Sequence, residues 1–190
     1  MEGCDLSPVQ PVVVPENLSF YIDDVSCLDP SYRNYDFIHI RGLNGCFQDW
    51  GAFYKSVLNA LCFGGWVEQV ELDLKLFAHQ AALPDDDPVK RLQKSVFEAA
   101  KVTGRSLDVC DNVYDGLIQA GFSEVFQHTI TCPIGRWARG EAQKTRGMWA
   151  DFYWRRSLED LCLALLTRFL GVRKDTTQDS FVAEPQTDDS

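Results

Sequence analysis

The sequence has few positive charges. It carries 18 Lys and Arg residues against 28 Asp and Glu residues, which gives a formal net charge of −10 at pH 7. No stretch of the chain is rich in Lys or Arg, and a negative net charge opposes binding to a phosphate backbone. We therefore expect no direct nucleic-acid partner.

Long apolar runs and paired cysteines are also missing. No run of roughly 18 uninterrupted apolar residues occurs, and the first residues include Glu2 and Asp5 in place of a basic leader. The seven cysteines are odd in number and never form a C-x-x-C pair, so neither a disulfide framework nor a zinc site is indicated. We expect buried reduced thiols, no metal, no membrane association, and a cytoplasmic or nuclear location.

The patterns that are present predict an α/β fold. Residues 18–22 and 35–40 are short β-prone runs and predict strands. Asp49 is expected to cap a helix whose apolar residues recur at helical spacing up to residue 61, with Gly64 and Gly65 as its stop and a third strand at 66–74. Strand, helix and strand in succession predict a βαβ unit with parallel strands.

Further patterns complete the predicted layout. Helices are expected at 89–102, at 111–120 and at 158–169, and the alternating run at 124–131 is expected to be a strand. Three prolines within the first 17 residues indicate a loop there. We predict one domain over residues 1–171, followed by a disordered acidic tail over 172–190.

Polar residues just past the predicted strands are the candidate ligand-binding groups, because ligands of open parallel sheets bind outside the carboxyl ends of the strands. These residues are Asp5, Asp23, Asp24, Arg41, Asn44 and the acidic stretch 68–73. Carboxylates there can accept hydrogen bonds from a ribose diol or an adenine amine. Position alone leaves open the alternative that Asp23 and Asp24 only cap or solvate a loop.

Aromatic and histidine side chains are weaker candidates. We expect Trp50 and Trp66 to be core residues, and we leave the cluster around Trp149 and Trp154 undecided between core and an apolar substrate pocket. The three histidines, at positions 39, 79 and 128, are expected to be structural. No catalytic base is identified, so the catalytic residues remain unknown.

Eight short runs match a known family in the family's own order over residues 4–171. They are DLSPVQP (5–11), VPENLSF (14–20), IDD (22–24), YDFIHIRGLNG (35–45), DW (49–50), GGWVE (64–68), AGF (120–122) and PIGRW (133–137). Together they resemble the LaeA-like fungal methyltransferases that use S-adenosylmethionine. The resemblance implies a Rossmann-like class I methyltransferase sheet and methyl transfer to a small molecule in secondary metabolism.

The same resemblance assigns roles to four residues. It implies that Asp5 ends the family's second strand and binds the cofactor ribose. It also implies that Asp23 and Asp24 lie beside the adenine and that Arg41 lies near the cofactor.

One part of the family pattern is absent. The family's first strand and its G-x-G-x-G turn should precede Asp5, where this sequence has only Met1-Glu2-Gly3-Cys4. That strand would lie between the family's second and fourth strands, so we expect a sheet without its central strand, and also without a final strand after residue 171. A homodimer or a partner chain would then complete the sheet.

Three other hypotheses about the function remain open. The chain could be a degenerate member that acts as a cofactor-independent cyclase or isomerase, or a non-catalytic partner or regulator of secondary metabolism. A Rossmann oxidoreductase ranks last, since the glycine fingerprint of that class is missing.

Overall fold

The computed structural model describes residues 1–27, 32–78 and 82–169. The predicted tail at 172–190 and His79 lie outside the described residues. The chain divides into two compact units, the first formed by Met1–Leu72 and Asp108–Phe126 and the second by Asp73–Leu107 and Gln127–Ser190. The single domain over residues 1–171 stays a prediction.

The first unit contains two parallel strand pairs. Strand β1 (Glu2–Asp5) pairs with β2 (Ser19–Ile22), and β3 (Tyr35–Arg41) pairs with β4 (Leu61–Val70). Each pair is a separate two-stranded sheet, and a short 3-10 helix, η1 (Val25–Cys27), follows β2. Within the residues that the structure describes, the sheet is thus split, and the fold is α/β with parallel strands. A loop had been expected at residues 1–17, so strand β1 corrects that prediction in part.

Helix α1 (Trp50–Ala60) connects β3 to β4 and begins where its cap residue predicts. The Asp49 side chain accepts a hydrogen bond from the Ala52 N–H at 2.8 Å, which satisfies one of the free donors of the first turn. The predicted stop at Gly64 and Gly65 is wrong, because the helix ends at Ala60 and β4 begins at the next residue. A Cβ at Gly65 would lie 2.9 Å from the Tyr35 carbonyl oxygen, so glycine here permits the close approach of β3 and β4.

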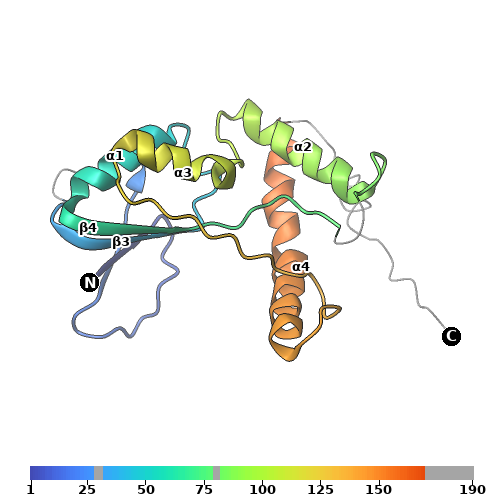
Figure 1. Cartoon of the computed structure of the whole chain (residues 1–190), viewed down its shortest axis with the longest axis horizontal. Helices are drawn as coiled ribbons and strands as arrows, with labels where there is room; N and C mark the ends of the chain where they lie inside the picture. Colours follow the sequence, from blue (N-terminus) through green and yellow to red (C-terminus); the bar gives the residue numbers. More distant parts are fainter. Residues whose placement is uncertain (28–31, 79–81, 170–190) are drawn as a thin grey trace. The chain divides into compact units, whose positions relative to one another are not determined.

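Helices α1 and α3 (Val109–Ala120) pack together and lie over the β3–β4 sheet (Figure 1). Helix α3 ends at Gly121 in the left-handed conformation, with φ 111°. The buried core residues are Ile40, Phe47, Phe53, Tyr54, Val57 and Leu117, and Trp50 packs against them. Core burial was expected for Trp66 as well, but its side chain is 56% exposed on the face of β4 away from the helices.

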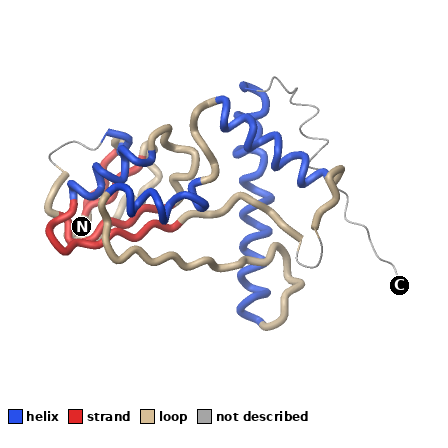
Figure 2. The backbone as a smooth tube through the Cα atoms, turned by 45° about the horizontal axis from the view of Figure 1, so that its top comes forward, coloured by secondary structure: helices blue, strands red, loops and turns tan. Residues whose placement is uncertain are grey.

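The second unit is built from helices and loops, and all strands drawn in red in Figure 2 belong to the first unit. Helix α2 (Pro88–Val102) starts at Asp87, whose side chain accepts from the Val89 N–H at 2.8 Å. Helix α4 (Glu141–Phe169) starts 17 residues before the predicted position. The strand predicted at 124–131 is wrong, because within the described residues nothing pairs with this segment.

A second core holds α2 and α4 together. Leu74, Val96, Ala100 and Leu107 are buried, and Trp154 of α4 packs against them. Trp149, Phe152 and Tyr153 are instead exposed. The aromatic cluster left undecided by the sequence therefore divides between a core contact and an exposed helix face.

Candidate functional site

The paired strands β1 and β2 bring two of the predicted ligand-binding carboxylates together. Asp5 is the last residue of β1, and Asp23 directly follows β2. The Asp23 N–H donates a hydrogen bond to the Asp5 carbonyl oxygen at 3.2 Å, so the parallel pairing itself sets their proximity. Both side chains are exposed, as is Asp24.

The carboxylates also stabilise the turns that carry them. Asp5 Oδ1 accepts from the Ser7 N–H at 2.8 Å, and Asp24 Oδ1 accepts from the Ser26 N–H at 2.9 Å. Both contacts are Asx turns, so the local structural role considered for Asp24 is present. Each oxygen of Asp5 keeps lone pairs for a ligand, because a carboxylate offers about four acceptor positions.

Asp23 has a partner that the sequence did not indicate. The Tyr32 hydroxyl donates to Asp23 Oδ2 at 2.9 Å, and Oδ1 accepts from the Asp24 N–H. The hydrogen bond to Asp23 is the main cause that raises the pKa of Tyr32 to about 12. The tyrosine thus orients one of the predicted adenine-side carboxylates.

Asp23→Asn is expected to lower the pKa of Tyr32 toward the ordinary tyrosine value of about 10. The pKa of Tyr32 is higher in the folded than in the unfolded chain, so the protonated hydroxyl stabilises the fold. This stabilisation is complete below a pH of about 10 and is lost as the pH rises through about 12. Tyrosinate absorbance, recorded as the difference from a Tyr32→Phe variant, measures this pKa. Asp36→Asn serves as the control, and an unchanged Tyr32 pKa in Asp23→Asn would refute the contact.

Arg41 ends β3, and the turn after it is held by a carboxylate from the neighbouring strand. Glu71, one residue past β4, accepts from the backbone N–H groups of Leu43 at 3.1 Å and Asn44 at 3.2 Å. The Gln69 side chain donates to the same carboxylate at 3.2 Å. Glu71 lies within the acidic stretch noted in the sequence, but its role depends on the pairing of β3 with β4.

The four predicted cofactor residues therefore all lie at carboxyl ends of strands or directly after them. Contacts join Asp5 to Asp23, and none among the described residues joins Arg41 to that pair. His39, predicted to be structural, pairs its Nδ1 with Glu68 Oε2 at 2.8 Å on the exposed face of the β3–β4 sheet. His128 is exposed in a loop.

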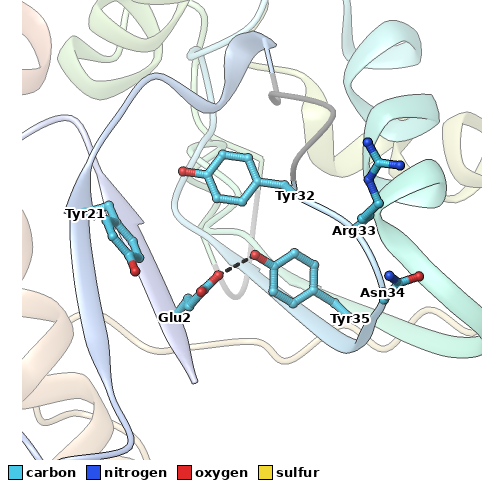
Figure 3. A pocket seen from close by; sticks show the side chains of 6 residues that line it. All are labelled: Glu2, Tyr21, Tyr32, Arg33, Asn34 and Tyr35. Carbon is cyan, nitrogen blue, oxygen red and sulfur yellow. Dashed lines mark hydrogen bonds between the residues drawn. The ribbon is translucent and has the colours of Figure 1, made fainter.

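A pocket of about 360 Å³ lies at the opposite, amino end of the strands, and it was not foreseen from the sequence. It is lined by Glu2, Tyr21, Tyr32, Arg33, Asn34 and Tyr35. Figure 3 shows Glu2 of β1 and Tyr35 of β3 pointing toward one another, and the Tyr35 hydroxyl donates to Glu2 Oε2. Partial burial, followed by this hydrogen bond, raises the pKa of Tyr35 to about 12.

Among the described residues, no group of three or more His, Cys, Asp or Glu side chains is placed to hold a metal ion. None of the described helices is long and apolar enough to span a membrane. Burial had been expected for the thiols, but Cys4 and Cys132 are exposed and Cys46, Cys62 and Cys110 are half-buried.

Comparison with known proteins finds fungal relatives over most of the chain. The methyltransferase pytC of Aspergillus terreus is 30% identical over 169 residues, which are 89% of this chain and 52% of pytC. The secondary metabolism regulator LAE1 of Cochliobolus heterostrophus is 28% identical over 87% of this chain and 55% of its own length. The protein-methionine methyltransferase laeA of Emericella nidulans is 28% identical over 87% of this chain and 45% of its own length.

The chain thus spans about half the length of the curated relatives it matches. No protein-family model and no solved structure matches it. The relatives nevertheless confirm the resemblance seen in the short runs, since they include both methyltransferases and regulators of secondary metabolism. Over the region that it shares with them, this chain is similar to the LaeA-like group of fungal methyltransferases and secondary-metabolism regulators.

Proposed function

We propose that the chain contributes to an S-adenosylmethionine-dependent methyltransferase that acts on a small molecule of fungal secondary metabolism. The observation that carries this proposal is the placement of Asp5, Asp23 and Arg41 at the carboxyl ends of parallel strands, where open α/β sheets bind nucleotides. The names of the relatives pytC and laeA support the same activity.

The nucleoside end of the cofactor fits these residues chemically. The exposed Asp5 carboxylate would accept hydrogen bonds from the ribose hydroxyls, and Asp23 with Asp24 would accept from the adenine amine. Arg41 would lie near the cofactor at the end of β3. When bound, S-adenosylmethionine supplies the methyl group, and the chain's own task is to hold the nucleoside and orient the acceptor.

We also propose the finer fold. The two parallel pairs β1–β2 and β3–β4, with α1 crossing between β3 and β4, would be parts of one class I methyltransferase sheet in a domain over residues 1–171. The right-handed crossover expected for β3–α1–β4 supports this arrangement. A cytoplasmic or nuclear location is proposed with it, consistent with free cysteines in the described residues.

Calorimetric titration with S-adenosylhomocysteine tests the proposal. We expect the folded chain to bind, and Asp5→Asn to weaken binding about tenfold or more, because a hydrogen bond to a charged group contributes about 1.5–3 kcal/mol. Asparagine can still accept from the Ser7 N–H, so the turn after β1 is kept. Glu16→Gln, an exposed change outside the site, is the matched control. A folded chain that binds no S-adenosylhomocysteine would refute the proposal.

A second candidate is a non-catalytic partner in the regulation of secondary metabolism. It is favoured by the relative LAE1, which is named as a regulator. This function predicts a stable complex with a longer relative and no binding of S-adenosylhomocysteine by the chain. The same titration therefore separates the two candidates.

A further inference from the structure

The turn at residues 42–45, directly after β3, has little conformational preference of its own. Two of its residues, Gly42 and Gly45, have φ of 68° and 78°, in the left-handed region. Glycine adopts this region as readily as the right-handed one, so the two glycines permit the turn without favouring a single form. Contacts from outside the turn must therefore fix its conformation.

Glu71 supplies two of these contacts. Its Oε1 accepts from the Leu43 N–H and its Oε2 from the Asn44 N–H. The carboxylate is itself held by Gln69, whose Nε2 donates to Oε1 at 3.2 Å. These hydrogen bonds are partly buried, and bonds to an ionised acceptor are stronger than those between neutral groups. Glu71 thus ties the turn to the end of β4.

The pairing of β3 with β4 does not depend on this carboxylate. The last pair in register is Arg41 with Val70, and the Gly42 N–H donates to the Val70 carbonyl oxygen at 3.1 Å. These backbone contacts close the end of the sheet without any side chain. Glu71 acts beyond them, on the two residues that follow Gly42, so its effect is local to the turn.

Arg41 is the charged residue that this turn adjoins. Its side chain is exposed, and its guanidinium takes part in none of the hydrogen bonds or ion pairs found among the described residues, those of Glu71 included. The guanidinium is therefore available to a ligand at the carboxyl end of β3. Since no side-chain contact holds it there, its place is set by the backbone of β3 and of the turn.

We propose that Glu71 is a positioning residue for cofactor binding: it fixes the turn at residues 42–45 and, through the backbone of that turn, the place of Arg41. This inference rests on the proposed function, in which Arg41 lies near the cofactor. Glu71 contacts the backbone and not the ligand. It strengthens binding because a preorganised group loses less conformational freedom when the ligand arrives.

A direct contact of Glu71 with the ligand is the alternative. Three donors already surround the half-buried carboxylate, namely the N–H groups of Leu43 and Asn44 and the side chain of Gln69. A carboxylate offers about four acceptor positions, so most of its capacity is used within the chain. This arrangement favours a positioning role over a ligand contact.

A double-mutant cycle measured by calorimetric titration with S-adenosylhomocysteine tests the inference. We expect Glu71→Ala and Arg41→Ala each to weaken binding about tenfold. Once Arg41→Ala is present, Glu71→Ala should weaken binding by less than about twofold more, because residues that act through one group are not additive. Equal losses from Glu71→Ala in both backgrounds would overturn the proposal.

Two variants separate the turn contacts from the negative charge. Glu71→Gln keeps one acceptor oxygen for the turn, so we expect it to weaken binding only about threefold. Glu68→Gln is the matched control, because Glu68 is an exposed carboxylate of β4 that pairs with His39 and does not contact the turn. We expect it to bind normally. A loss in Glu68→Gln as large as that in Glu71→Ala would refute the positioning role.

Gly42→Ala disturbs the turn while Glu71 stays in place, and it serves also if Glu71→Ala does not fold. A Cβ at Gly42 meets no atom within 4 Å, so the change acts through the strained left-handed conformation alone. We expect this variant to weaken S-adenosylhomocysteine binding at least about threefold, since the strain costs about 1–2 kcal/mol. Normal binding by folded Gly42→Ala would overturn the proposal.

The wild-type titration separates this inference from the proposed function. No binding of S-adenosylhomocysteine by the folded wild-type chain would refute the proposed function, and this inference with it. Wild-type binding that folded Glu71→Ala retains in full would overturn this inference alone and leave the proposed function intact.

Discussion

Tyr54→Ala is expected to reduce the free energy of unfolding of the first unit by about 3–5 kcal/mol, the range found when large aromatic core residues are truncated. Tyr54 is 1% exposed and lies at the centre of the first core, with its ring 5.5 Å from that of Trp50. Truncation leaves a cavity that α1 and α3 cannot fill without moving. Urea denaturation followed by fluorescence measures the change.

Tyr54→Phe is the matched control and is expected to change stability by less than about 1 kcal/mol. The hydroxyl is buried without a hydrogen bond of normal geometry in the described residues, and burial is the main reason that its pKa is raised. Removing a polar group that has no partner costs little. A large loss in Tyr54→Phe would show that the hydroxyl is hydrogen-bonded after all.

Gly116 provides an independent check on the same contact. A Cβ at this position of α3 would lie 2.8 Å from Cε2 of the Tyr54 ring. Gly116→Ala should therefore destabilise the wild-type chain but stabilise Tyr54→Ala, where the ring is gone and only the higher helix propensity of alanine remains. Equal effects in the two backgrounds would contradict the packing of α1 against α3.

Glu71→Ala is expected to cost about 2–3 kcal/mol and to loosen the turn that follows β3. It removes the acceptor of two backbone N–H groups, those of Leu43 and Asn44, and hydrogen bonds to a charged group are the stronger ones. Denaturation measures the loss, and faster amide exchange at Leu43 and Asn44 locates it.

Glu71→Gln is the control for that prediction. Its single carbonyl oxygen can still accept one of the two N–H groups, so we expect a loss of about 1 kcal/mol. If Glu71→Ala is as stable as the wild type, the carboxylate does not hold the turn. Arg41 directly precedes that turn, and its position would then have to be set by β3 alone.

The candidate site was predictable in position but not in its contacts. Asp5, Asp23, Asp24 and Arg41 could be found from the resemblance and from the rule that ligands bind beyond the carboxyl ends of parallel strands. The partners Tyr32 and Glu71 could not, because the tertiary structure brings them to their sites: Tyr32 is 9 positions from Asp23, and Glu71 is 28 and 27 positions from Leu43 and Asn44. The pocket at Glu2 and Tyr35 joins residues 33 positions apart.

The strand boundaries, too, were predictable only in part from the local sequence. Residues 1–5 precede three prolines and have the local character of a loop, yet Glu2–Asp5 is a strand because β2 pairs with it. Gly64 and Gly65 have the character of a helix stop, yet they lie within β4, where the register with β3 shifts between the pairs Tyr35–Leu61 and Phe37–Trp66. Residues 124–131 alternate as a strand would, but no strand among the described residues pairs with them.

The sequence by itself determined the features that depend on neighbouring residues: the cap of α1 at Asp49, the end of α3 at Gly121, and the order of strand, helix and strand. These depend on hydrogen bonds and backbone conformations that span only a few positions. Only the tertiary structure decided which segments are strands, that Trp66 is exposed, and that the strands form two separate pairs. A strand is stable only where another strand satisfies its backbone, and that partner can lie anywhere in the chain or in another polypeptide.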